Sequence, residues 1–281
     1  GLKLPGLTDP PTLTSQSAGT RGTSHRASQA SNSSANASLA PAANTTTHEE
    51  TWSMTEEIVE VAPGIKQMQW LFNGQAPGPT LRGKVGDKFK ITIKNEGSMA
   101  HSIDFHASRA SPDTTMRTIS PGRSLDVEFT IDHAGIWLYH CSTMPMSAHI
   151  AAGMFGALIV APADLPTVDR QYVLVQSETY LAEQNNQPVD TGRIADEKVD
   201  LTMFNGHANQ YLFAPLQARV GERVRFWVLA AGPSRGMSFH IVGAQFDTVF
   251  KEGAYLLRRD EPDYNPDEKF ATIERKFRVE G

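Results

Sequence analysis

The chain contains very little cysteine, no strong excess of either charge and no long apolar run. Cys141 is the only cysteine among 281 residues, which excludes a disulfide within the chain. The formal net charge is only −5, and no basic cluster indicates a nucleic acid or an anionic membrane surface as partner. No apolar stretch is long enough to cross a bilayer as a helix. The hydrophobic fraction of 40% is nevertheless sufficient for the core of one large or two ordinary domains.

The chain does have a group of potential metal ligands around its one cysteine. Cys141 directly follows His140, and His149 and Met154 lie shortly downstream. One thiolate, two imidazoles and a weak thioether are the ligands of a blue electron-transfer copper, and His101 would be the second imidazole. Taken singly, Cys141 is more typical of a small buried apolar residue, and Met154 of a core residue. Their occurrence together within fourteen residues favours a copper site.

The first fifty residues differ in composition from the rest. Residues 1–50 are rich in Ser, Thr, Ala and Asn and contain few large apolar side chains. Such a segment cannot bury enough apolar surface to offset the entropy lost on ordering. The sequence therefore predicts a disordered N-terminal arm over 1–50.

From Trp52 onward, short alternating runs separated by Gly and Pro indicate an all-β fold. Alternation with a period of two is clear in KFKITIK (88–94) and in LDVEFTI (125–131). No stretch of this region has the pattern of a long amphipathic helix. Many short strands with regular turn signals predict β-sandwiches.

An internal repeat predicts two copies of one domain. Residues 72–95 and 204–230 share Phe-Asn-Gly, then Pro and Leu, then Val-Gly-Asp/Glu before an alternating strand. The boundary is expected near 161–170, which gives domains over 51–163 and 164–281. The C-terminal residues lack the Gly-x-Trp/Tyr-x-x-His pattern of the first copy. The second copy is therefore expected to be incomplete, through either truncation or divergence.

Strand geometry sorts the candidate ligands into two groups. Side chains alternate between the two faces of a strand, so the adjacent residues His140 and Cys141 face opposite sides. In HSIDFH (101–106) the first and last residues also face oppositely, whereas Asp104 and His106 share a face. The peptide link between His140 and Cys141 would then join the two groups by a short path for one electron. The alternative is that His106 and His140 are ordinary surface histidines. The inner group is His101, Cys141, His149 and Met154, and the outer group is Asp104, His106 and His140.

The motifs HSIDFHA and YHCSTMPMSAHIAAGMFGALIV, with the doubled sandwich, resemble copper-containing nitrite reductases and related two-domain cupredoxin oxidases. The resemblance covers roughly residues 55–250. It implies two tandem cupredoxin-like Greek-key β-sandwiches, with a type 1 copper site in the first domain and a type 2 copper between subunits. In the resemblance, His101, Cys141, His149 and Met154 hold the type 1 copper. The type 2 copper is held by His106 and His140. Asp104, and His240 of a neighbouring subunit, deliver protons to the bound nitrite.

The resemblance also implies a homotrimer, a small redox protein as electron donor and an extracytoplasmic location. The chain departs from the family in two respects, a missing late histidine and a changed ligand loop, and a separate test concerns laccases. No histidine follows His240, although the family takes a third type 2 imidazole from late in the second domain. The loop from Cys141 to His149 is one residue shorter than in denitrifying reductases, and Ala148 stands where those commonly have Trp. No His-x-His pair occurs, which argues against the trinuclear copper cluster of laccases.

The sequence therefore predicts a copper-dependent oxidoreductase that reduces nitrite to nitric oxide by one electron. The alternative is a non-enzymatic cupredoxin electron-transfer module, or a fragment of a multicopper oxidase that acts on another substrate. The missing late histidine and the N-terminal arm favour this alternative.

Overall fold

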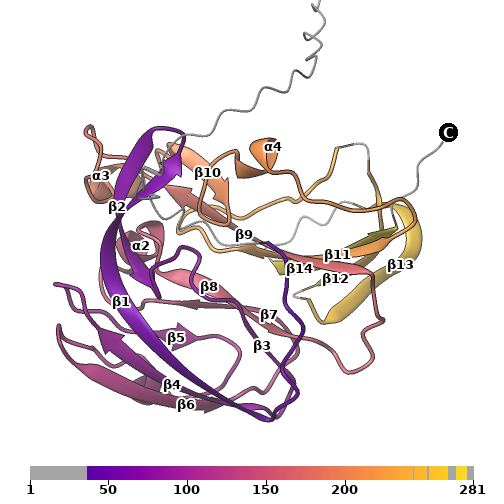
Figure 1. Cartoon of the computed structure of the whole chain (residues 1–281), viewed down its shortest axis with the longest axis horizontal. Coiled ribbons are helices and arrows are strands. Elements are labelled where there is room, and N and C mark those ends of the chain that lie inside the picture. Colours follow the sequence, from indigo (N-terminus) through magenta and orange to yellow (C-terminus); the bar gives the residue numbers. More distant parts are fainter. Residues whose placement is uncertain (1–36, 243, 252, 265–269, 277–281) are drawn as a thin grey trace, which may run out of the picture. The chain divides into compact units, whose positions relative to one another are not determined.

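The first domain consists of two four-stranded sheets that enclose one hydrophobic core (Figure 1). The computed structural model describes residues 37–242, 244–251, 253–264 and 270–276, and most of the predicted arm lies outside them. One sheet has the order β2-β1-β4-β6, and the other has the order β3-β8-β7-β5. The strands are β1 (Thr47–Ala62), β2 (Ile65–Phe72), β3 (Leu81–Gly83), β4 (Lys88–Asn95), β5 (Asp104–Phe105), β6 (Ser124–Thr130), β7 (Gly135–His140) and β8 (Phe155–Val160), with short helices α1 (Pro112–Thr115) and α2 (Met146–Ala151) between them.

The alternating runs form strands with one buried face, as the sequence predicts. In β4, Phe89, Ile91 and Ile93 are buried, while Lys90 and Lys94 on the other face reach solvent. The antiparallel partner β6 continues the pattern, because Phe89 pairs with Phe129 and Ile91 with Val127. Cross-strand apolar pairs of this kind fix the register, since a slip by one residue would turn every apolar side chain outward.

The described strands of the second domain form one six-stranded sheet, with the order β10-β9-β11-β14-β12-β13. The sequence predicts a second two-layered sandwich. In the structure, connecting segments that carry Phe239, Met237 and Tyr211 cover the face of this sheet that points away from the first domain. The tail beyond Lys276 lies outside the described residues. The elements are β9 (Arg170–Thr179), α3 (Thr191–Ala195), β10 (Leu201–Phe204), α4 (Gln210–Phe213), β11 (Arg223–Ala230), β12 (Phe246–Lys251), β13 (Tyr255–Tyr264) and β14 (Phe270–Lys276).

The two domains share an apolar junction. One face of β7 and β8, including Ile136 and Leu138, packs against Val173 of β9 and Trp227 of β11. The described residues from Ala37 onward belong to one compact unit. β8 ends at Val160 and β9 begins at Arg170, so the predicted boundary near 161–170 falls between two strands and stays a prediction.

Residues 37–50 belong to the folded part of the chain, although the sequence analysis places them in the arm. Ser38 forms a β-bridge with Tyr172 of the second domain. The N–H of Lys88 donates to the carbonyl of Thr46, and β1 begins at Thr47. Backbone hydrogen bonds to both domains order this polar segment, and these bonds cannot be predicted from amino-acid composition.

The repeated Phe-Asn-Gly turns have the same local structure in both domains, and they meet at the junction. Asn73 and Asn205 both adopt left-handed backbone angles, with φ of 52° and 55°. Each side-chain carbonyl accepts a backbone N–H from a neighbouring strand, that of Ser53 in the first domain and that of Val175 in the second. A Cβ on Gly206 would lie 1.9 Å from the carbonyl oxygen of Ala76, so only glycine allows the two turns to touch.

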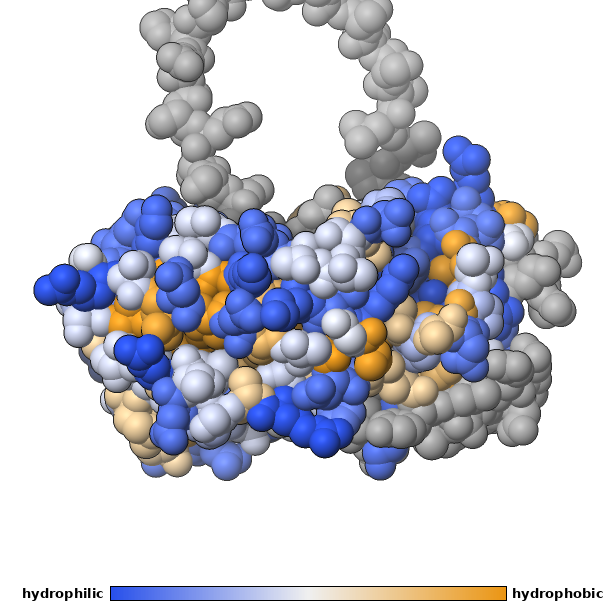
Figure 2. All heavy atoms as spheres, turned by 90° about the horizontal axis from the view of Figure 1, so that it is seen from below, coloured by the Kyte–Doolittle hydropathy of each residue, from blue (hydrophilic) through white to orange (hydrophobic). Residues whose placement is uncertain are grey.

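The surface is mostly polar. On the face shown in Figure 2, apolar side chains lie in patches between polar and charged ones. None of the helices in the described part of the chain is long and apolar enough to cross a membrane.

Candidate metal centres

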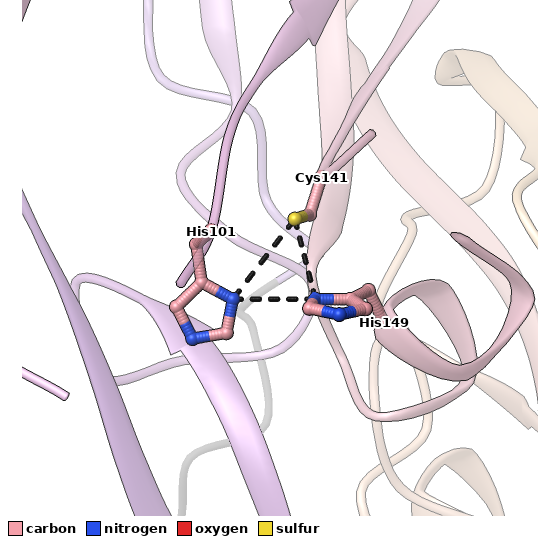
Figure 3. Close-up of side chains that lie close together, drawn as sticks. All are labelled: His101, Cys141 and His149. Atoms are coloured by element: carbon pink, nitrogen blue, oxygen red, sulfur yellow. Dashed lines mark hydrogen bonds between the residues drawn. The ribbon is translucent and has the colours of Figure 1, made fainter. Parts of the chain in front are cut away.

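Three side chains of the predicted inner group point toward one another in the core of the first domain (Figure 3). The Nδ1 atoms of His101 and His149 lie 3.2 Å apart. The Sγ of Cys141 lies 3.3 Å from Nδ1 of His149 and 4.0 Å from Nδ1 of His101. His101 and Cys141 are fully buried, and His149 is 1% exposed. We call these three side chains the inner cluster.

Three separate segments place the inner cluster. His101 precedes β5 and is held by two backbone hydrogen bonds with Ile119. Cys141 directly follows β7, and α2 carries His149. Met154 completes the group at the main chain: its carbonyl accepts from the N–H of Cys141, and its N–H donates to the carbonyl of His149. Its side chain is fully buried.

The spacing of the inner cluster fits one metal ion. The three distances define a triangle whose corners lie on a circle of about 2.1 Å radius. Metal–nitrogen and metal–thiolate distances in proteins are about 2.0–2.3 Å. One soft sulfur and two imidazoles suit a copper that cycles between its two oxidation states.

Burial keeps both imidazoles neutral. It lowers the pKa of His149 to about 4, and the neighbouring His101 adds to this effect. Burial also lowers the pKa of His101, against the opposing charge of Glu56. Because only neutral imidazole binds a metal, both side chains are ready to act as ligands at neutral pH.

Sequence reasoning missed several residues around the inner cluster. The ring of Trp70 lies 4.6 Å from that of His149 and 5.8 Å from that of His101, between centroids. The carboxylate of Glu56 accepts the N–H of Ser98 and Met99, which orders the loop that leads to His101. Only the three-dimensional fold reveals these contacts, because β1 and β2 lie far from the ligand motifs in the sequence.

The outer group also assembles, on the opposite side of β7. The register of β5 on β7 sets Asp104 opposite His140. The Nε2 atoms of His106 and His140 lie 3.1 Å apart, and Oδ2 of Asp104 lies 3.5 Å from Nε2 of His106. We call Asp104, His106 and His140 the outer cluster. As predicted, the side chains of the adjacent residues His140 and Cys141 point to opposite sides, since they belong to different clusters.

The outer cluster is open to solvent. His140 is buried, but the side chains of Asp104 and His106 are 27% and 38% exposed. When Nδ1 of His140 donates to the carbonyl of Cys141, 2.9 Å away, Nε2 keeps its lone pair for a metal. Two imidazoles with a nearby carboxylate can hold copper and leave positions open for a small ligand.

His240 does not join either cluster of this chain. It is exposed, in the segment between β11 and β12, next to the buried Phe239. Its predicted role involves the cluster of a neighbouring subunit, so it stays a prediction, as do the roles of the other proposed ligands.

Comparison with known proteins identifies the family. Residues 53–164 match the family model described as multicopper oxidase. The structure of the copper nitrite reductase from Nitrosomonas europaea is 33% identical and has a TM-score of 0.75, over 84% of this chain and 86% of that one. This chain belongs to the family of copper-containing nitrite reductases and two-domain multicopper oxidases. The predicted tandem cupredoxin-like fold is thereby confirmed.

Other family members show the same likeness. The copper-containing nitrite reductase from Neisseria gonorrhoeae is 33% identical over 73% of this chain, which spans 55% of the length of that relative. The copper-containing nitrite reductase from Thermus scotoductus is 26% identical, with a TM-score of 0.75, over 84% of this chain and 56% of that one. A solved multicopper oxidase is 27% identical, with a TM-score of 0.70, over 84% of this chain and 81% of that one.

Proposed function

We propose that this chain is part of a copper enzyme that reduces nitrite to nitric oxide: nitrite, two protons and one electron give nitric oxide and water. The observation that carries the proposal is the placement of the adjacent residues His140 and Cys141 in two different metal-binding clusters. One peptide link therefore joins a buried redox site to an open site. The named relatives are nitrite reductases, which agrees with this arrangement.

The two clusters have different tasks in this proposal. His101, Cys141, His149 and Met154 hold a type 1 copper, and His106 and His140 hold a type 2 copper. Copper supplies a one-electron redox couple at the first cluster and a Lewis acid for nitrite at the second. The buried inner ligands exclude water, and the exposed side of the outer cluster, at Asp104 and His106, admits an anion from solvent.

Asp104 and His240 deliver the two protons. The carboxylate of Asp104 lies beside Nε2 of His106, within reach of an anion bound at the outer cluster. His240 is exposed and can enter the outer cluster of a neighbouring copy, which requires the proposed homotrimer. Because protons are consumed, activity is expected to rise as the pH falls. A rate that increases steadily from pH 5 to pH 9 would contradict this assignment.

The electron enters at the inner cluster from a small redox protein. Met144 and Met146, in the segment between Cys141 and His149, are 79% and 40% exposed and offer an apolar surface to such a donor. We propose an extracytoplasmic location for this reaction, as the family resemblance implies.

A second candidate is a cupredoxin module that only transfers electrons, or part of a multicopper oxidase with another substrate. The composition of the outer cluster favours this candidate, because the described residues supply only two imidazoles there. The similarity to a solved multicopper oxidase is consistent with it.

Counting copper and measuring activity distinguish the two candidates. The proposed enzyme should bind two coppers per chain, show both a thiolate charge-transfer band and an ordinary Cu(II) electron paramagnetic resonance signal, and release nitric oxide from nitrite with an artificial reductant. One copper per chain, with the thiolate band alone and no nitric oxide, would overturn the enzyme and support the electron-transfer module.

A further inference from the structure

Ser102 brings a backbone N–H and a hydroxyl group close to the sulfur of the inner cluster. Its backbone N–H donates to Sγ of Cys141 at 3.4 Å, and its Oγ lies 4.0 Å from the same sulfur. Ser102 is 2% exposed, so water does not compete for these contacts. Hydrogen bonding around the cysteine sulfur is one of the factors that set the reduction potential of a copper–thiolate site.

The neighbouring hydroxyls orient the hydroxyl of Ser102. Its oxygen accepts the backbone N–H of Ser142 at 3.2 Å. It also lies 2.8 Å from Oγ of Ser142 and 3.0 Å from Oγ1 of Thr143. A serine hydroxyl has one hydrogen and two lone pairs. When the Ser142 N–H and one neighbouring hydroxyl fill the lone pairs, the hydrogen of Ser102 is left for the sulfur.

The same contacts hold the ligand loop in place. Ser102 follows His101, whereas Ser142 and Thr143 follow Cys141. One hydroxyl therefore connects the segment of an imidazole ligand to the segment of the thiolate ligand. A fixed separation between these two segments limits the rearrangement of the site when its oxidation state changes.

We propose that Ser102 is a positioning residue that raises the reduction potential of copper bound at Cys141. It acts through its own hydroxyl, which the hydroxyls of Ser142 and Thr143 orient. A thiolate that accepts hydrogen bonds donates less charge to the metal, and this disfavours Cu(II) relative to Cu(I). The proposal rests on the inner copper site of the proposed function, and it holds whichever substrate the outer cluster takes.

Ser102→Ala in the copper-loaded full chain tests this role, with Ser102→Thr as the matched control that keeps the hydroxyl. Redox titration of the thiolate charge-transfer band should give a lower midpoint potential for Ser102→Ala. The energy of the band should also shift, and Ser102→Thr should restore both values. An unchanged potential and band in fully loaded Ser102→Ala would overturn the proposal, as would a Ser102→Thr variant that behaves like Ser102→Ala.

Thr143→Val provides the test if Ser102→Ala does not fold. It removes the far hydroxyl of the network at a partly exposed position, so the potential should fall by less than in Ser102→Ala. No change in potential would then overturn the proposal. Nitrite assays distinguish the role of Ser102 from the proposed function. If the midpoint potential shifts as predicted but the chain produces no nitric oxide, the role of Ser102 is supported and nitrite reduction is contradicted.

Discussion

The inner and outer clusters lie beside the same two strands, β5 and β7, but differ in how completely this chain builds them. The inner cluster takes one ligand from each of three segments, buries all three, and has a buried methionine beside it. The outer cluster is partly exposed and has two imidazoles and one carboxylate in the described residues. The chain encloses the first site by itself and leaves the second open toward other molecules.

In the proposed function, this difference separates electron storage from substrate binding. A buried site with preset ligands changes oxidation state with little rearrangement, and water is excluded from it. An open site must admit an anion and protons, so part of its coordination has to come from outside the cluster. Placing the two sites on opposite faces of β7 meets both requirements within one peptide link.

The largest effect is expected from Cys141→Ser. This substitution removes the only soft ligand of the inner cluster, so the thiolate charge-transfer band and the electron supply should both be lost. Nitrite reduction should fall to background, while the ordinary Cu(II) signal of the outer cluster should persist. Visible absorption and electron paramagnetic resonance spectra check the result; a retained charge-transfer band would contradict the assignment of the thiolate.

His106→Ala tests the outer cluster alone. The variant should keep the thiolate band, because His106 points away from Cys141, and it should lose one of two coppers together with nitrite reduction. Copper analysis by mass spectrometry measures the loss. If both coppers remain bound and nitric oxide is still produced, the outer cluster is not the catalytic site.

Asp104→Asn should leave both coppers bound and slow proton transfer. The amide keeps the size of the side chain but cannot deliver a proton, so nitrite reduction is expected to fall by about 10²–10⁴-fold. The increase in rate toward low pH should also flatten. Steady-state rates across a pH series measure both changes, and a variant with the full rate would exclude Asp104 as the proton donor.

Gly206→Ala is expected to have the smallest effect on chemistry and to act through the domain junction. A Cβ at Gly206 would overlap the carbonyl of Ala76, whose side chain lies against Gly153 beside Met154. The inner cluster should therefore respond more than the outer one, through a broadened thiolate band. Overpacking typically costs about 1–3 kcal/mol, which denaturant unfolding can measure.

Gly221→Ala is the matched control for that substitution. Gly221 has the same φ of +85° as Gly206, but a Cβ there would meet nothing within 4 Å. It should therefore show only the cost of a left-handed alanine, about 1–2 kcal/mol. Equal losses of stability in the two variants would mean that the contact between Gly206 and Ala76 contributes nothing.

Local patterns predicted much of the site but not its surroundings. The alternation of side chains along a strand was sufficient to separate His140 from Cys141, and His101 from His106, because it is a property of the extended backbone. Trp70 and Ser102 carry no ligand motif of their own, and their proximity to the inner cluster depends on how distant strands pack. The contacts of residues 37–46 with both domains were likewise hidden, since composition says nothing about backbone pairing.

The sequence by itself determined the type of ligands, the all-β framework and the face on which each ligand lies, because these follow from side-chain chemistry and strand periodicity. The tertiary structure decided that His101, Cys141 and His149 converge to the spacing of one metal ion, and that burial keeps the imidazoles neutral. It also decided that the hydroxyl of Ser102 lies beside the sulfur. Distances between segments far apart in the chain, and the exclusion of water from them, arise only when the strands pack into one core.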